Sequence, residues 1–116
     1  MLSRTNRFHG HNSLNWAYRH GATIRDSKMS LKYAANQRRR NFRAAVVVSR
    51  KVSKSAVVRN RIRRRIYEIL RSYSQGIDGG QDLIFMVYSA DIADMPQSEL
   101  EALVKRLLTE SKTLSR

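Results

Sequence analysis

The sequence predicts an α+β fold, an α/β sandwich in which helices pack on one small sheet. Two apolar runs with the periodicity of strands flank a long segment with the periodicity of a helix, and a second helical stripe follows near the C-terminus. The length of 116 residues suits one domain with a single core. We therefore expect residues 1–116 to form a single domain, in which the polar and basic residues 1–11 are an irregular arm.

The N-terminal half is expected to contain one short helix and two strands. Residues 13–20 are predicted to be helical, because residues that can cap a helix stand at their start and Gly21 can end it. Residues 29–35 alternate between apolar and polar side chains, which predicts a weak strand. Residues 42–49 predict a stronger strand that is apolar on both faces. Such a strand is typical of the centre of a sheet, so we expect a central position.

The strongest helical pattern comes next. Ser53 or Ser55 can cap its start, and Gly76 can end it. Its apolar residues recur with a period of 3.6 and are Val58, Ile62, Ile66, Ile69, Leu70 and Tyr73. These residues predict one buried stripe along a long helix.

A buried strand and a last helix are predicted for the C-terminal part. Gly79 and Gly80 break the chain, and residues 83–88 form an apolar run. Ser98 and Glu101 have the spacing of a capping box, and Pro96 suits an early helical turn. The helix that follows has an apolar stripe of Leu100, Leu103, Val104, Leu107 and Leu108. The unit from residue 42 to residue 88 is therefore strand–helix–strand, for which a right-handed crossover is the default.

The net charge is the strongest indication of a partner. The chain has 23 lysine and arginine residues against nine acidic ones, and its formal net charge is +14. Residues 1–75 hold 19 of the basic residues and two of the acidic ones, whereas residues 76–116 carry a net charge of −3. A field of this size repels itself unless a polyanion neutralises it. Nucleic acid is the first candidate partner and an anionic membrane surface the second.

Five arginines fall within residues 59–65, on the helix whose other side is apolar. At 100° per residue from Ile62, four residues point away from the apolar stripe: Asn60, Arg64, Tyr67 and Arg71. Arg61 and Arg63 lie on either side of it. Arg59 and Arg65 flank the stripe, so their stems are expected to lie on the core with their heads in solvent. The basic residues that extend the patch before the helix are Arg50, Lys51 and Lys54.

This arrangement is typical of phosphate binding. Guanidinium groups grip phosphate oxygens in a fork, and a helix fixes their spacing. Glu68 is the only acidic residue that is expected to be near enough to pair with them. Phe8, Trp16 and Tyr18 are additional aromatic rings on which unpaired RNA bases can stack.

The sequence gives little support for a protein-based catalytic or metal site. It has no cysteine, which excludes disulfides, thiolate metal ligands and a cysteine nucleophile. His9 and His11 have no third ligand at a suitable spacing. Four acidic residues near predicted strand and helix ends are interpreted as caps and turns: Asp78, Asp82, Asp91 and Asp94. We expect neither a catalytic residue nor a metal ligand in this chain.

The chain is also expected to be cytoplasmic. Its longest apolar run, Leu83–Val87, is far shorter than the roughly 20 residues that cross a bilayer. Its N-terminus lacks the apolar core of a secretory signal. The absence of cysteine agrees with a reducing compartment.

Residues 48–64 closely resemble the signature of the bacterial ribonuclease P protein subunit. In that family a V-S-K-K strand end leads into an R-N-R-x-K-R helix, and here Val48-Ser49-Arg50-Lys51 leads to Arg59-Asn60-Arg61-Ile62-Arg63-Arg64. Arg7-Phe8 and Tyr18-Arg19-x-Gly21 add support. The resemblance covers nearly the whole chain, weakly in residues 1–40 and 75–116.

The resemblance implies a subunit of a ribonucleoprotein endonuclease that removes the 5′ leader of precursor tRNA. The RNA subunit and its Mg²⁺ ions carry out the hydrolysis, and the protein binds that RNA and holds the leader. The protein by itself is expected to bind no cofactor. The implied fold is a small mixed sheet with αβββαβα order and an arginine-rich central helix. Its strand–helix–strand crossover is left-handed, and we adopt this hand in place of the default.

The resemblance also implies the site residues. The residues expected to contact the catalytic RNA are Arg50, Lys51, Lys54, Arg59, Asn60, Arg61, Arg63, Arg64, Arg65 and Arg71. The leader cleft lies between the first helix and the sheet, with Phe8, Leu14 and Tyr18 as its candidates. Leu14 stands where the family has an aromatic ring. Tyr67 stands where the family has a further basic residue, so Arg65 or Arg71 is expected to make that contact.

Other classes of protein remain as alternatives. A ribosomal-type protein that binds structured RNA would use the same arginines without a preference for a leader. A DNA-binding regulator is disfavoured, because the arginine helix lies between two strands and no helix-turn-helix pattern is present. A membrane-surface helix is disfavoured because the apolar side of the helix is needed to cover the sheet.

Overall fold

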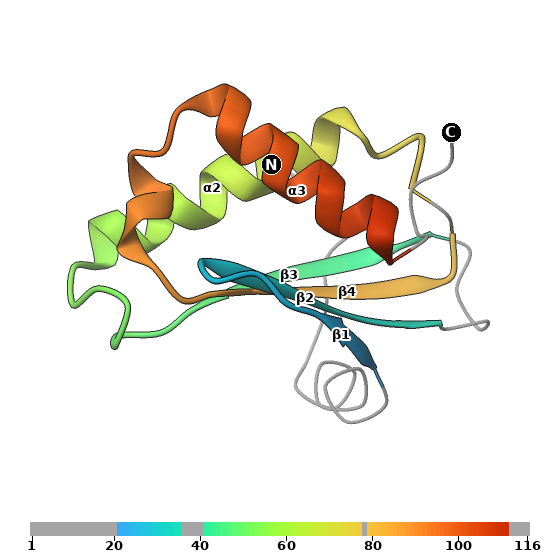
Figure 1. Ribbon diagram of the computed structural model, residues 1–116, viewed down its shortest axis with the longest axis horizontal. Helices are drawn as coiled ribbons and strands as arrows, with labels where there is room; N and C mark the ends of the chain where they lie inside the picture. Colours follow the sequence, from blue (N-terminus) through green and yellow to red (C-terminus); the bar gives the residue numbers. More distant parts are fainter. Residues whose placement is uncertain (1–20, 36–40, 78, 112–116) are drawn as a thin grey trace.

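The computed structural model describes residues 21–35, 41–77 and 79–111. In this part of the chain one sheet carries two helices on the same face, as Figure 1 shows. The elements, in chain order, are β1 (Ala22–Ile24), β2 (Met29–Ala35), β3 (Arg43–Val48), α2 (Ala56–Ser72), β4 (Gln81–Val87), the 3₁₀ helix η2 (Ala90–Ala93) and α3 (Gln97–Glu110). The predicted helix at 13–20 and the arm at 1–11 lie outside the described residues.

The sheet is mixed, and its strand order is β1-β2-β4-β3. β2 is antiparallel to both β1 and β4, whereas β3 and β4 are parallel. Three strands therefore precede α2 and one follows it, which confirms the predicted α+β class. β2 has the predicted bounds, and β3 is one residue shorter at each end than predicted. β4 begins two residues earlier and ends one residue earlier than predicted. Helix α2 connects β3 to β4, and the left hand of this crossover stays a prediction.

The predicted central position of β3 is wrong, because β4 is central and β3 lies at the edge. One face of β3 is buried as predicted, with Ala44, Val46 and Val48 in the core. The other face carries Val47, which is 39% exposed. Its apolar character therefore does not arise from a central position. The hydroxyl of Tyr67 on α2 accepts a hydrogen bond of 3.1 Å from the backbone N–H of Val46, which protects this edge.

The core lies between the sheet and the two helices. Leu31, Leu83 and Phe85 face the helices from the sheet and are fully buried. The predicted stripes supply the opposite side. Their buried members are Ile62, Ile66, Ile69 and Leu70 on α2, and Leu100, Val104, Leu107 and Leu108 on α3. Both helices are thus oriented by their apolar sides.

The start of α2 agrees with prediction, and its end does not. Ser55 is the N-cap, and its hydroxyl accepts a hydrogen bond of 3.3 Å from the N–H of Val58. The helix ends at Ser72, four residues before the predicted stop at Gly76. The N–H of Tyr73 bonds to carbonyls of the last turn, and the N–H of Gly76 bonds to the carbonyl of Tyr73. A tight turn therefore takes up the residues before Gly76.

The predicted capping box of α3 is wrong. The helix begins at Gln97 with Pro96 as its N-cap, and no side chain caps it. The Pro96 carbonyl accepts bonds of 3.0 Å from the N–H groups of both Glu99 and Leu100. Ser98 therefore lies inside the first turn, two residues after the cap position. Glu101 instead accepts a bond from the side-chain amide of Gln97, one turn earlier.

A buried ion pair joins β3 to β4. The Arg43 guanidinium donates two hydrogen bonds, of 2.9 and 2.8 Å, to the two oxygens of Asp82. The side chains are 7% and 1% exposed. Because Arg43 lies opposite Asp82 in the parallel register, the pair fixes the alignment of the two strands.

Replacement of Asp82 by alanine is expected to lower the free energy of unfolding by about 3–5 kcal/mol, because it leaves a buried guanidinium without its carboxylate. Urea denaturation followed by circular dichroism measures the change. The control is Asp94→Ala, which breaks an exposed pair and should cost less than about 1 kcal/mol. Equal losses in the two variants would contradict this account.

Candidate nucleic-acid interface

The arginines of α2 lie on the sides of the helix that do not face the core. Ile62 and Ile66 are fully buried against the sheet, and this packing sets the rotation of the whole helix. Positions 60, 61 and 64 are exposed and position 63 is half-exposed. The predicted division of the helix into an apolar and a cationic side is therefore confirmed.

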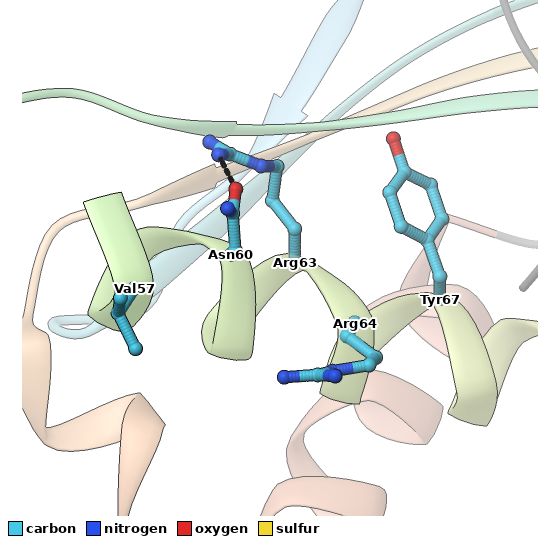
Figure 2. Close-up of a pocket in the computed structure, with 5 residues that line it drawn as sticks. All are labelled: Val57, Asn60, Arg63, Arg64 and Tyr67. Atoms are coloured by element: carbon cyan, nitrogen blue, oxygen red, sulfur yellow. Dashed lines mark hydrogen bonds between the residues drawn. The ribbon is translucent and has the colours of Figure 1, made fainter.

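A hollow of about 400 Å³ lies along the outer side of α2. It is lined by Val57, Asn60, Arg63, Arg64 and Tyr67. Figure 2 shows Asn60, Arg63 and Tyr67 pointing to one side of the helix, toward β3, and Val57 and Arg64 pointing away from them. Arg63 donates a hydrogen bond to the side-chain oxygen of Asn60. Cationic heads beside the apolar surface of Val57 and the Tyr67 ring can hold a nucleotide by its phosphate and its base.

A second hollow, of about 680 Å³, lies at the start of α2. Its lining residues include four of the predicted RNA contacts: Arg50, Lys51, Lys54 and Arg59. No acidic residue occupies the first turn of α2, so the positive end of the helix dipole adds to this charge. Arg59 is half-buried and donates a bond of 2.9 Å to the carbonyl of Ser53, which orients its head toward the loop. The structure thus brings these four cations together.

Two predicted contacts pair with carboxylates. Arg61 lies 3.4 Å from Asp94, and Arg71 lies 3.1 Å from Glu68. Glu68 is therefore not the single acidic partner of this helix: Asp94, which follows η2 and is distant in sequence, also reaches it. All four side chains are exposed, so solvent screens both pairs, and each can yield to a phosphate.

The expectation that the Arg65 head reaches into solvent is wrong. Its guanidinium donates hydrogen bonds of 2.7, 3.1 and 2.6 Å to the carbonyls of Ile92, Ala93 and Met95, and one of 3.2 Å to the side chain of Gln97. Arg65 therefore fastens η2 and the start of α3 to α2. Helical spacing cannot reveal these acceptors, because they lie about 30 residues further along the chain.

The predicted orientation of the Tyr67 side chain is also wrong. The 100° rule points it away from the core, but the ring packs partly against the core and its hydroxyl reaches β3. Tyr67, which stands where the family has a basic residue, therefore has a structural role, because its hydroxyl binds the edge strand β3. Of its two predicted replacements, Arg65 is occupied by carbonyls and Arg71 remains exposed.

The three predicted residues of the leader cleft, Phe8, Leu14 and Tyr18, lie outside the described residues, as do Trp16, His9 and His11. The sheet face turned away from α2 and α3 is described. It carries Val47 and Tyr88, which are 39% and 48% exposed. The prediction that Tyr88 belongs to a buried strand is wrong, because β4 ends at Val87 and strand alternation turns Tyr88 to the face opposite the buried Val87.

Of the four acidic residues predicted to be caps and turns, Asp91 and Asp94 lie in η2 and at its C-cap, as predicted. Asp82 lies inside β4, where the prediction is wrong, and Asp78 lies outside the described residues. Asp82 pairs with Arg43, Asp91 with Lys28, and Asp94 with Arg61. Among the described residues, no three His, Cys, Asp or Glu side chains are grouped so as to hold a metal ion. In the same part of the chain, no helix is long and apolar enough to span a membrane.

Comparison with known proteins relates this site to one family. The family model described as Ribonuclease P matches residues 2–112. The chain is 41% identical over 83 residues to the ribonuclease P protein component of Roseiflexus castenholzii, covering 72% of this chain and 67% of that protein. It is 31% identical over 115 residues to that of a Pseudanabaena species, covering 98% and 97%. The chain spans 56% of the length of the Chloroflexus aurantiacus protein that it matches.

The fold is similar to that of a solved structure. The Staphylococcus aureus RNase P protein superposes with a TM-score of 0.83 over 95% of this chain and 98% of that one. The two sequences are 22% identical. At this identity the likeness establishes the shared arrangement of the sheet and helices.

Replacement of Arg65 by methionine is expected to lower the free energy of unfolding by about 1.5–3 kcal/mol. Methionine keeps an apolar stem but leaves three carbonyls without their donor. Chemical denaturation checks the value. The neighbouring Arg64→Met is the matched control, because Arg64 is exposed, and it should change stability by less than about 0.5 kcal/mol. A stable Arg65→Met protein would show that the carbonyl contacts contribute little.

Proposed function

This chain belongs to the ribonuclease P protein family, and we propose that it is the protein subunit of a ribonuclease P ribonucleoprotein. In this role it binds the catalytic RNA subunit and the 5′ leader of precursor tRNA. It thereby promotes endonucleolytic removal of the leader, which matures the 5′ end of the tRNA in the cytoplasm. The RNA subunit, with its Mg²⁺ ions, performs the hydrolysis of the phosphodiester bond.

The observation that carries this proposal is the outer side of α2. Asn60, Arg63 and Arg64 line one hollow on a helix that is held rigidly by its buried side. The cationic hollow at the start of the same helix extends the surface toward the end of β3. Folded RNA presents phosphates at fixed spacings, and a rigid array of guanidinium groups matches them at low entropic cost.

The distribution of the carboxylates supports assigning hydrolysis to the RNA partner. Hydrolysis by the protein would require carboxylates or a histidine set to activate water. Asp82 is instead buried in its pair with Arg43, and Asp26 lies 2.6 Å from Arg106. Guanidinium groups thus engage both of these carboxylates, which supports a structural use of them.

The arrangement of the sheet supports a separate place for the leader. Helices α2 and α3 cover one face, so the RNA subunit and the leader can bind on different sides of the molecule (Figure 1). The other face carries Val47 and Tyr88, which are 39% and 48% exposed, and the half-buried Lys32. Single-stranded RNA binds surfaces of this composition.

Reconstitution tests the proposal. The purified protein should stimulate cleavage of a precursor tRNA by the catalytic RNA subunit at physiological Mg²⁺, and it should cleave nothing without that RNA. Cleavage is followed by the release of the leader on a gel. Equal binding to any folded RNA without stimulation would instead favour a ribosomal-type protein.

Replacement of Arg64 by alanine should weaken binding to the RNA subunit and flatten the dependence of log K on log salt by about one unit, because one phosphate contact is lost. Filter binding between about 50 and 200 mM salt measures the slope. Lys105→Ala is the control: it removes one positive charge from the exposed side of α3 and should leave the slope unchanged. An unaltered slope in Arg64→Ala would show that Arg64 does not contact phosphate.

A further inference from the structure

Two arginines of α2, one helical turn apart, face the segment that follows β4. Arg61 and Arg65 stand at positions i and i+4, so they lie on the same side of the helix. Helix η2 packs against α2, as Figure 1 shows. The two guanidinium groups use this segment differently. Arg65 donates to backbone carbonyls, whereas Arg61 lies 3.4 Å from the carboxylate of Asp94.

The backbone on both sides of Asp94 is fixed. The carbonyls of its two neighbours, Ala93 and Met95, accept bonds of 3.1 and 2.6 Å from the Arg65 guanidinium. Asp94 is also the C-cap of η2, and its own N–H donates a bond of 3.1 Å to the carbonyl of Asp91. Asp94 therefore presents its carboxylate to α2 without the entropic cost of ordering a loop.

The pair between Arg61 and Asp94 is not needed to hold this segment. The Asp94 side chain is 83% exposed and that of Arg61 is 56% exposed, so solvent screens their attraction. The bonds from Arg65 to three carbonyls already fasten η2 to α2. The consequence of the pair therefore lies in what else can bind to Arg61.

Arg64 offers a comparison on the same helix. It is exposed and lines the hollow on the outer side of α2. No carboxylate of a described residue lies within ion-pair distance of it. A phosphate can therefore bind Arg64 directly, whereas at Arg61 it has to replace a carboxylate that is already in place.

The surroundings of Asp94 add negative charge. Asp91, Asp94 and Glu99 line one hollow of about 430 Å³, where Lys28 is the one cation among the described lining residues. Lys28 itself pairs with Asp91, at 3.7 Å. A phosphate that approaches Arg61 from this side is repelled, because like charges face each other there.

We propose that Asp94 is an intramolecular counterion that competes with RNA phosphates for Arg61 and thereby limits how tightly the arginine helix binds RNA. This step rests on the proposed function, which makes RNA the ligand of α2. Binding at Arg61 exchanges one anion for another, so part of the attraction of the phosphate is offset by the loss of Asp94. Asp94 thus distinguishes RNAs that place a phosphate at Arg61 from RNAs that contact the outer side of the helix alone.

Replacement of Asp94 by asparagine tests the proposal, because asparagine keeps the shape of the side chain and removes its charge. Asp94→Asn should bind the catalytic RNA subunit about two- to five-fold more tightly, the factor that corresponds to loss of one competing exposed ion pair. Filter binding at about 150 mM salt measures the change. Weaker or unchanged binding would overturn the proposal, and weaker binding would make Asp94 a residue that orients Arg61 for the phosphate.

Asp91→Asn is the matched control. It removes the same charge from the same short helix, but Asp91 pairs with Lys28 and not with an arginine of α2. At about 150 mM salt its long-range effect is screened, so it should change RNA affinity less than about 1.5-fold. An equal gain in the two variants would overturn the proposal, since net charge alone would then explain it. Circular dichroism and thermal unfolding of each variant confirm the fold.

A double-mutant cycle shows whether Asp94 acts through Arg61. In an Arg61→Ala background, Asp94→Asn should change RNA affinity less than about 1.5-fold, because the competition has lost its object. Correspondingly, Arg61→Ala should cost about two- to five-fold more affinity in Asp94→Asn than in the wild-type protein. A gain from Asp94→Asn that is the same with and without Arg61 would overturn the proposal.

The outcomes distinguish this inference from the proposed function. If the protein stimulates the RNA subunit but Asp94→Asn shows no gain that depends on Arg61, the inference fails and the proposed function stands. If the wild-type protein does not stimulate the RNA subunit, the proposed function fails. The same cycle measured with mature tRNA, as a structured RNA, then decides whether Asp94 competes with phosphates for Arg61.

Discussion

Burial of the apolar side of α2 is the constraint on which the rest of the structure depends. Ile62, Ile66 and Leu70 are fully buried between the helix and the sheet, so the helix cannot rotate without exposing them. The arginines between these residues are therefore held on known sides: Arg61 toward Asp94, Arg63 and Tyr67 toward β3, and Arg64 outward. The helix remains stable despite repulsion among its closely spaced guanidinium groups, because packing of its apolar side against the core stabilises it.

Periodicity predicted β2, β3, α2, β4, α3 and both buried stripes, but it missed the short strand β1, which only the family resemblance implied. It placed β2 at its true bounds and left Ser53 and Ser55 as alternative caps of α2, of which Ser55 is the cap. It failed where a residue's partner is distant in sequence. β3 lies at the edge because only β4 pairs with it. The apolar character of its second face does not show how many strands pair with it. The early start of α3 depends on Pro96 accepting two backbone bonds, which a match to a capping-box spacing does not test.

The candidate site divides in the same way. Its cationic side follows from the motif and from helical geometry, which is why Arg64 lies where it was predicted. The individual roles do not follow. Arg65 and Arg64 are adjacent and chemically identical, yet one donates to three carbonyls and the other lines an open hollow. A helix with five arginines in seven residues therefore combines structural and ligand-binding members, and only tertiary contacts separate them.

The parallel pairing of β3 and β4 determines which segments meet at one end of the sheet. Both strands end together, one leading to the start of α2 and the other to η2. The cations that precede the helix and the segment that leads to α3 therefore leave the sheet at the same end. Arg65 fastens η2 and the start of α3 to α2 by hydrogen bonds to the carbonyls of Ile92 and Met95. One arginine of the motif thus holds together the segments that follow the two strands, while its neighbour Arg64 stays exposed on the outer side of the helix.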